Sequence, residues 1–231
     1  MTTKQVMIEG LENPAYDIWS KTFPYGNEDI LARHKRLYGD NLPSLDMATL
    51  RKGAEEIVNK HLVRDQVVHT YAWAVPSPEI LHEIKFRANG RGIIEIGAGS
   101  GYWAKLLNSI GVDIVAYDLQ PYKNHWMHND KKFYEVKRGD HTAIQEHKDR
   151  LLFLCWPPYD GGVLLDACLD VYTQDLIFYI GEWSACTSWS DRFEKEWEDI
   201  HTIPCPQWDG IHDCLFVMSR KSNIAEGQSG D

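Results

Sequence analysis

The segment from Ile93 to Ala104, with the sequence IIEIGAGSGYWA, constrains the fold of this chain most strongly. An apolar run that enters a glycine-rich loop and then a helix start predicts a buried β-strand, a tight turn and an α-helix. Gly97, Gly99 and Gly101 lack a Cβ, so the backbone at these positions can turn sharply and approach a ligand closely. The segment therefore predicts an α/β unit with a ligand-binding turn.

The residues around this loop disfavour a dinucleotide as the ligand. The glycine spacing is G-x-G-x-G, whereas a dinucleotide pyrophosphate is bound by G-x-G-x-x-G. Tyr102 stands in the place of the third glycine of that motif, and Glu95, just before the loop, would repel a diphosphate. The next apolar run ends in Asp118, where a carboxylate can bind the two hydroxyl groups of a ribose. These features suit an adenosyl ligand without phosphate, namely S-adenosylmethionine.

The same stretch resembles motif I of the class I S-adenosylmethionine-dependent methyltransferases. The resemblance covers about residues 90 to 220 and implies a doubly wound, mostly parallel seven-stranded Rossmann-like α/β sheet with an antiparallel strand near its edge. It implies S-adenosylmethionine as the cofactor, with cofactor-binding residues Glu95, Gly97, Gly99, Gly101, Asp118 and Asp140.

Asp140 has two interpretations. In the family, an acidic residue after the third strand accepts a hydrogen bond from the adenine amino group, and Asp140 matches that position. Aspartate is also a favoured N-cap, and Asp140 precedes a helix predicted at 141–149. The two roles can coexist.

The stretch from Leu151 to Asp160, LLFLCWPPYD, predicts a strand that enters a rigid loop, because its two prolines fix φ and supply no N–H. It resembles motif IV of amino-group methyltransferases, in which Asp, Asn or Ser before Pro-Pro and an aromatic residue holds the target nitrogen. Pro157, Pro158 and Tyr159 match, but Trp156 is a hydrogen-bond donor without an acceptor atom. Main-chain carbonyls beside the prolines can still accept, and the alternative is a loop that packs on the core. With YIGEW at 179–183, the stretch is similar to a group of poorly characterised methyltransferase-like proteins.

Glu182 and Trp183 end another predicted strand, so we expect them on the same side as the glycine loop. With Trp73, Trp156 and Tyr159 they are predicted to form an aromatic, acidic pocket that suits an amine, another cation or a flat heterocycle. The alternative for Glu182 is a solvated strand end. The predicted catalytic residues are Trp156, Pro157, Tyr159 and Glu182, and the candidate bases for an amine acceptor are Glu182, Asp160, His125 and His141.

The alternation of strands and helices divides the chain into an N-terminal helical extension (1–88), a methyltransferase core (89–221) and a tail (222–231) that we expect to be disordered. We expect the helices of the extension to form a lid, with Tyr71 and Trp73 over the pocket. The face of Ala54, Ile57, Val58 and Leu62 has helical spacing. In the core, strands are predicted at 92–97, 112–118, 133–137, 151–156, 175–182 and 214–220, and helices at 101–110, 141–149, 161–172 and 191–201. Phe193, Trp197 and Ile200 would form the buried stripe of the last helix.

Composition bears on the partners and the compartment. The 231 residues, 43% hydrophobic and 25% charged, fit one globular core, and a net charge of −10 disfavours general electrostatic binding to nucleic acid. Five cysteines without a C-x-x-C pattern or a signal peptide predict free thiols in the cytoplasm, and no apolar run reaches the length of a membrane span. No metal site is predicted, because the pairs His125/His128, His201/Cys205 and His212/Cys214 do not complete a zinc ligand set.

These observations predict an S-adenosylmethionine-dependent methyltransferase that acts on an N or O nucleophile, with a small molecule favoured as the acceptor over protein or nucleic acid. The alternatives are a DNA or RNA base N-methyltransferase and a non-catalytic module that binds an adenosyl ligand. A nucleotide-dependent dehydrogenase is disfavoured by Tyr102 and Glu95. The acceptor, the base and the oligomeric state are left open.

Overall fold

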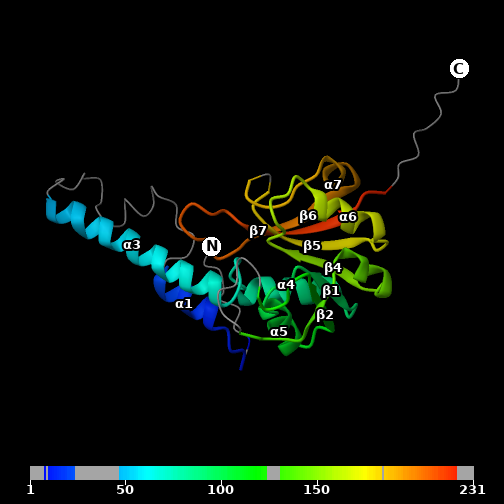
Figure 1. Ribbon diagram of the computed structural model, residues 1–231, viewed down its shortest axis with the longest axis horizontal. Coiled ribbons are helices and arrows are strands. Elements are labelled where there is room, and N and C mark those ends of the chain that lie inside the picture. The colour runs from blue at the N-terminus through cyan, green and yellow to red at the C-terminus, as the bar shows by residue number, and fades with distance from the viewer. Residues whose placement is uncertain (1–7, 9, 24–46, 124–130, 184, 223–231) are drawn as a thin grey trace, which may run out of the picture.

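The computed structural model describes residues 8, 10–23, 47–123, 131–183 and 185–222. Figure 1 shows a twisted sheet with helices on both sides and one long helix, α3, that reaches away from this body. The strands are β1 (Ile93–Ile96), β2 (Ile114–Asp118), β3 (Val136–Arg138), β4 (Leu151–Cys155), β5 (Leu176–Gly181), β6 (Trp197–Pro204) and β7 (Cys214–Arg220). The helices are α1 (Pro14–Thr22), α3 (Met47–Thr70), α4 (Pro78–Ala88), α5 (Tyr102–Ser109), the 3-10 helix η1 (His141–Glu146), α6 (Val163–Val171) and α7 (Asp191–Glu196).

The sheet has seven strands in the order β3-β2-β1-β4-β5-β7-β6. Strands β1 to β5 pair in parallel, whereas β7 pairs antiparallel with both β5 and β6. This arrangement confirms the predicted doubly wound, mostly parallel Rossmann-like methyltransferase fold with an antiparallel strand near its edge. The chain leaves β1 toward β2 and β3 and then returns to β4 on the other side of β1. Ligands of such sheets bind at the carboxyl ends of the strands that flank this switch point.

Alternation along the central strands produces two hydrophobic cores. Ile93 of β1 and Phe153 of β4 belong to a cluster that also takes in residues of α1, α3, α4 and α5. Their neighbours Ile94 and Leu152 point to the other face, where they pack with residues of η1, α6 and α7. Successive side chains of a strand face opposite sides, so a strand buried on both faces is apolar throughout.

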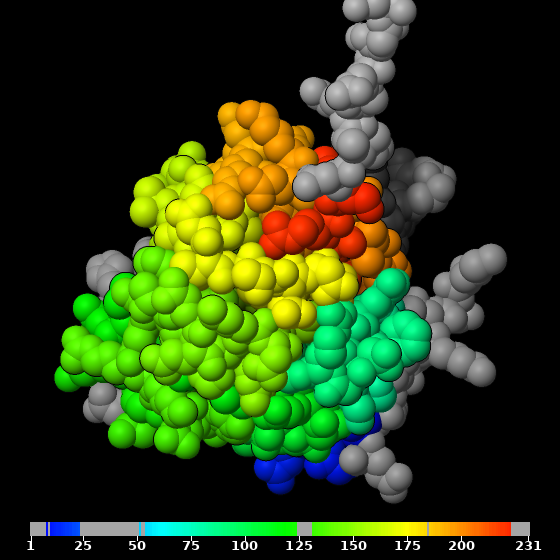
Figure 2. Space-filling view, turned by 90° about the vertical axis from the view of Figure 1, so that its right-hand side faces the viewer, coloured from blue at the N-terminus to red at the C-terminus, as the bar shows by residue number. Residues whose placement is uncertain are grey.

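The N-terminal helices pack directly on the body. Asn13 caps α1, and its side-chain oxygen also accepts a hydrogen bond from the hydroxyl of Tyr102 in α5 at 2.9 Å. Figure 2 shows α1, in blue, against the green layer that contains α5. Ser77 caps α4 and Pro78 is its first residue. Of the predicted apolar face of α3, Ile57, Val58 and Leu62 are 56%, 56% and 61% exposed, respectively.

The predicted helix at 191–201 is wrong in its second half. Helix α7 ends at Glu196 and strand β6 begins at Trp197. Phe193 and Trp197 are both buried on the same core, so their spacing reports a shared face rather than one helix. Ile200 is 43% exposed. Pairing with β7, which satisfies the backbone groups of this segment, overrides its helical periodicity.

Two further predictions needed adjustment. The strand predicted at 133–137 is the shorter β3, which starts at Val136. The helix predicted at 141–149 is the 3-10 helix η1, which ends at Glu146.

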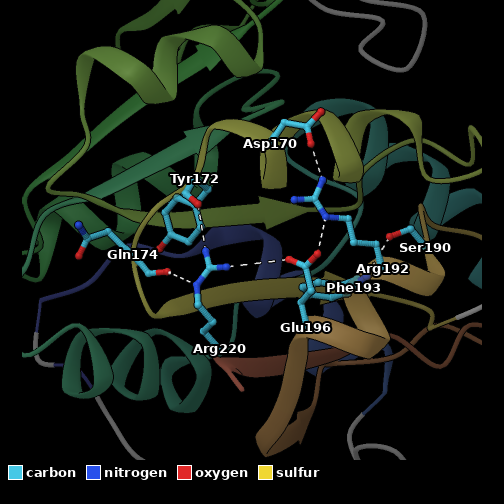
Figure 3. A network of polar contacts seen from close by, with 8 residues as sticks. All are labelled: Asp170, Tyr172, Gln174, Ser190, Arg192, Phe193, Glu196 and Arg220. Atoms are coloured by element: carbon cyan, nitrogen blue, oxygen red, sulfur yellow. Dashed lines mark hydrogen bonds and ion pairs between the residues drawn. The ribbon is translucent and has the colours of Figure 1, made fainter. Parts of the chain in front are cut away.

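A polar network joins α6, α7 and β7 on the α7 side of the sheet (Figure 3). The guanidinium of Arg220 donates to the carbonyl oxygen of Tyr172 at 3.0 Å and to that of Gln174 at 3.3 Å, and it lies 4.5 Å from the ring centroid of Trp197. Arg192 bonds to the carboxylates of Asp170 and Glu196. The network fastens the end of β7 to the layer that covers it.

Within the described ranges, no helix has the length and apolar character needed to cross a membrane.

Candidate functional site

The glycine loop after β1 turns through three left-handed residues. Gly97, Gly99 and Gly101 have φ values of 83°, 55° and 76°. A Cβ added at Gly97 would meet no atom within 4 Å, whereas at Gly101 it would lie 2.9 Å from side-chain atoms of Tyr134 and Val136. The loop therefore borders open space at Gly97, and Gly101 permits the close packing of α5 beside β3.

Asp118, at the end of β2, organises this loop. One carboxylate oxygen accepts the N–H of Gly99 at 2.8 Å and the other accepts the N–H of Gln120 at 2.7 Å. The side chain is buried, with 9% of its residue surface exposed. Each carboxylate oxygen can accept more than one hydrogen bond, so both keep capacity for a ribose diol. The diol contact stays a prediction.

Glu95 is a buried carboxyl group in the middle of β1, just before the loop. Only 2% of its surface is exposed, and its Oε2 has no hydrogen-bond partner among the described residues. Burial, and next the charge of Asp118, raise its pKa to about 8. A buried carboxylate without a partner is costly, so a cationic group near Oε2 would stabilise its charged form.

Asp140 lies beside the end of β2, because the N–H of Gly139 bonds to the carbonyl oxygen of Asp118 at 3.0 Å. Its carboxylate accepts the N–H of Thr142 at 2.9 Å and the hydroxyl of Thr142 at 2.6 Å, which confirms the N-cap. These hydrogen bonds lower the pKa of Asp140. The contact with adenine stays a prediction.

The proline loop after β4 holds Trp156 in an unusual conformation. Its φ is 52°, in the left-handed region that residues with a Cβ rarely adopt. Its N–H bonds to the carbonyl oxygen of Ile180 at 2.8 Å, and its ring stacks on Trp73 with centroids 5.1 Å apart. The indole Nε1–H donates to Oδ2 of Asp213 at 3.1 Å. Backbone and side chain therefore fix the ring together.

The other residues of this loop differ in accessibility. Pro157 is buried and its carbonyl oxygen already accepts the N–H of Ser188 at 3.2 Å. Tyr159 is 73% exposed. Asp160 accepts hydrogen bonds from Gly162, Leu164 and Ser188. Asp160 thus orders the loop, and this role disfavours it as a base.

Sequence reasoning missed Asp213 as a site residue. It precedes β7, and the pairing of Gly181 with Cys214 brings it beside the end of β5. It is 0% exposed, and its Oδ1 has no hydrogen-bond partner in the described chain. Burial raises its pKa to about 7, although the hydrogen bond from Trp156 acts in the opposite direction. The sequence signal was an acidic residue next to a predicted strand, which carries no information about the neighbouring strand.

Glu182 lies at the same edge and is 7% exposed, which contradicts its alternative interpretation as a solvated strand end. Its Oε1 accepts the N–H of His212 at 2.7 Å. Trp183, in contrast, does not join Trp73 and Trp156, which pack on the α5 side. It packs on the other core with Trp189 and Phe216, so its predicted place in the pocket is wrong. Glu182 and Trp183 follow the end of β5 at Gly181, and the chain there turns Trp183 toward the core that includes α7.

The remaining candidates add little to the site. His125 and His128 lie outside the described residues. His141 begins η1, next to the cap residue Asp140. Across the part of the chain that is described, no group of three or more His, Cys, Asp or Glu side chains is placed to hold a metal ion. None of the five cysteines forms a disulfide with another described residue.

No protein-family model matches the chain, and no curated protein matches it. Solved structures that resemble it include TrmN from Thermus thermophilus, at 12% identity and a TM-score of 0.41, over 63% of this chain and 49% of TrmN. The magnesium protoporphyrin IX methyltransferase ChlM from Synechocystis PCC 6803, solved with bound S-adenosylmethionine, is 10% identical over 93% of this chain and 100% of ChlM, with a TM-score of 0.43.

The O-methyltransferase TomG from Streptomyces achromogenes, also in complex with S-adenosylmethionine, is 14% identical over 64% of this chain and 82% of TomG, with a TM-score of 0.41. The chain thus spans about half the length of TrmN and most of ChlM and TomG. The fold assignment itself stands on the strand order described above.

Proposed function

We propose that this chain is an S-adenosylmethionine-dependent methyltransferase that acts on an N or O nucleophile of a small molecule. The carrying observation is the unpaired, buried carboxyl oxygen of Glu95 beside the open glycine loop at the switch point of the sheet. A diphosphate there would face the carboxylate of Asp118, and it would bring no cationic group to Glu95. S-adenosylmethionine has an adenosyl group, carries no phosphate, and bears an ammonium and a sulfonium cation. Its charge and its hydrogen-bonding groups therefore fit the residues present.

Each part of the cofactor has a candidate partner in the chain. Glu95 would hold a cationic group, the backbone at Gly97 and Gly99 would pass close to the ligand, and Asp118 would accept from the ribose hydroxyls. Asp140, which lies beside Asp118, would accept from the adenine amino group. When bound, the cofactor supplies a methyl group on a sulfonium, an electrophile that a nucleophile can attack in line.

The chain's own contribution to the reaction is positional. The stacked pair of Trp73 and Trp156 would form a rigid wall for the acceptor, because the backbone and the indole N–H of Trp156 are both bonded. Holding two reactants in line can lower the activation free energy by roughly 7–11 kcal/mol. The buried acids Glu182 and Asp213 and the net charge of −10 disfavour a polyanionic acceptor and support a small molecule.

The proposal is tested by proton-linked binding of S-adenosylhomocysteine, which keeps the ammonium of the cofactor. With a pKa of about 8, Glu95 is mostly protonated at pH 7 in the ligand-free chain. An ammonium beside Oε2 would lower that pKa, so binding should release up to one proton. Calorimetry at pH 7 in buffers of different ionisation enthalpy measures this release. Glu95→Gln should bind without releasing it.

A second assay identifies the class of acceptor. Labelled S-adenosylmethionine would be incubated with the chain and with separated small-molecule, protein and nucleic-acid fractions of a cell extract. Label should enter the small-molecule fraction. Absence of any S-adenosylhomocysteine binding would overturn the proposal, and transfer to DNA or RNA alone would replace it with base methylation. Binding without transfer to any fraction would favour a non-catalytic module.

A further inference from the structure

Position 156 carries a hydrogen-bond donor where the related motif has an acceptor. In the amino-group methyltransferases that the proline loop resembles, the residue at this position accepts a hydrogen bond from the target nitrogen, whereas Trp156 offers a donor. In the structure this donor is spent on Asp213, whose Oδ2 accepts the indole N–H at 3.1 Å. The other oxygen of Asp213, Oδ1, has no partner among the described residues, although 0% of Asp213 is exposed. Asp213 therefore has one oxygen, Oδ2, bonded to Trp156, which we propose as a wall of the acceptor site. Its other oxygen, Oδ1, has no partner among the described residues.

The charges that act on Asp213 leave a negative excess. Glu182 is a second buried acid, and its negative charge opposes ionisation of Asp213, whereas the positive charge of Arg64 favours it. The Arg64 guanidinium lies 5.3 Å from the ring centroid of Trp73, and no hydrogen bond joins it to Asp213 in the described chain. His212 Nδ1 lies 3.5 Å from Oε1 of Glu182, so with His212 neutral the two carboxylates face one guanidinium and leave one negative charge unbalanced when both acids are ionised.

We propose that Asp213 supplies the acceptor atom that position 156 lacks and that the methyl acceptor is an amine. This inference rests on the proposed methyltransferase function and deepens it. Asp213 would be a catalytic residue: Oδ2 fixes the indole of Trp156, and Oδ1 accepts a hydrogen bond from the protonated amine.

The ammonium loses one proton to the Asp213 carboxylate, which makes its nitrogen lone pair available. The amine nitrogen would then form the N–CH3 bond with the methyl group that the bound cofactor supplies, and the electron pair of the broken S–CH3 bond would stay on sulfur as a neutral thioether. The proton then leaves Asp213 for solvent. Burial makes this carboxylate a stronger base than an exposed one, and the match to an amine improves accordingly.

The proposal predicts a preference for an ammonium probe over a neutral analogue of the same shape. We would measure binding of benzylamine and benzyl alcohol to the full chain saturated with S-adenosylhomocysteine, at pH 8. Benzylamine should bind at least tenfold more tightly. Asp213→Asn should remove this preference, whereas Asp113→Asn, at an exposed aspartate paired with Arg150, should keep it. Thermal unfolding of each variant checks that it folds.

The pH dependence distinguishes a direct role of Asp213 from a structural one. In the wild type, the preference for benzylamine should rise as pH increases through about 7, where Asp213 ionises. In Asp213→Asn it should be independent of pH. Burial raises the pKa values of the neighbouring thiols of Cys155, Cys205 and Cys214, which therefore stay neutral over this range. His212→Gln is a control in which the pH dependence should persist. In Glu182→Gln the pH dependence should persist with its midpoint at a lower pH, because the charge of Glu182 opposes ionisation of Asp213.

An equal affinity for benzylamine and benzyl alcohol, or an unchanged preference in folded Asp213→Asn, would overturn this inference. Acetylation of the small-molecule extract fraction, which blocks primary and secondary amines, gives a second measure. Label transfer should fall at least tenfold after acetylation, and persistence of the label would again overturn it. Both failures are distinguishable from failure of the methyltransferase proposal, in which S-adenosylhomocysteine itself would not bind.

Discussion

Gly97 and Gly101 have similar backbone conformations, with φ of 83° and 76°, but an added Cβ meets different surroundings at the two positions. At Gly97 it would project into open space, and at Gly101 it would lie 2.9 Å from the side chains of Tyr134 and Val136. The first position therefore borders open space, where we propose that the ligand binds, and the second serves packing.

This contrast predicts opposite behaviour of two alanine variants. Gly97→Ala should lose roughly 1–2 kcal/mol from backbone strain and, in addition, most of its affinity for S-adenosylhomocysteine. Gly101→Ala should lose the same strain energy and, in addition, about 1–3 kcal/mol of stability from overpacking, with affinity for S-adenosylhomocysteine retained in the folded fraction. Urea denaturation with and without the ligand measures both terms. Equal ligand affinity in Gly97→Ala and in wild type would contradict a ligand at this loop.

The end of strand β7 is stabilised by a network in which Arg220 and Arg192 contribute different amounts to stability. The guanidinium of Arg220 bonds to two main-chain carbonyl groups (Figure 3). It also lies over the Trp197 ring, 4.5 Å from the ring centroid. Arg192, with 34% of its side chain exposed, pairs with carboxylates that are themselves partly exposed. Removal of Arg220 takes a donor from two part-buried main-chain carbonyl groups, whereas removal of Arg192 breaks ion pairs with carboxylates that are 68% and 38% exposed.

We therefore expect Arg220→Ala to lower the free energy of unfolding by about 1–3 kcal/mol. Arg192→Ala should lower the free energy of unfolding by about 1 kcal/mol or less, and this loss should become smaller in high salt. Urea denaturation at low and at 1 M salt compares the two. A larger loss for Arg192→Ala than for Arg220→Ala would show that the carbonyl contacts do not dominate the network.

Two buried carboxyl groups influence the stability of the whole molecule. The pKa values of Glu95 and Asp213 are raised to about 8 and about 7 in the folded chain. Between the unfolded values near 4 and these folded values, the folded state binds more protons than the unfolded state. Stability is then greatest below the unfolded pKa values and falls as pH rises through the folded ones.

The ligand-free chain should accordingly lose stability, on the order of a few kcal/mol, between pH 5 and pH 8.5. Glu95→Gln and Asp213→Asn should each flatten the decline, and the double variant should flatten it further. Urea denaturation across this pH range measures the effect. A stability that rises with pH in the wild type would show that these groups are ionised in the folded chain.

Local sequence determined the elements that carry the glycine loop. The run of apolar residues before Gly97, the glycines themselves, and the carboxylate that ends β2 at Asp118 all have meaning over short distances. Ser77 and Pro78 specify the start of α4 for the same reason, because a cap acts on the N–H groups of its own first turn. The parallel, doubly wound class of the sheet follows from the alternation of these elements.

The tertiary structure decided which strands lie next to each other and which distant residues meet at their ends. Trp197 and Ile200 continue the helical spacing of Phe193, but the segment 197–204 forms β6, because it pairs with β7 and local sequence does not predict that partner. The insertion of β7 next to β5 places Asp213 beside Glu182 and under the indole N–H of Trp156. The sequence showed that Trp156 lacks an acceptor atom, and the fold alone brought a carboxylate from 57 residues away to that position. Pairing between distant strands depends on the whole chain, since each strand's partner is chosen by which edges the rest of the sheet leaves available.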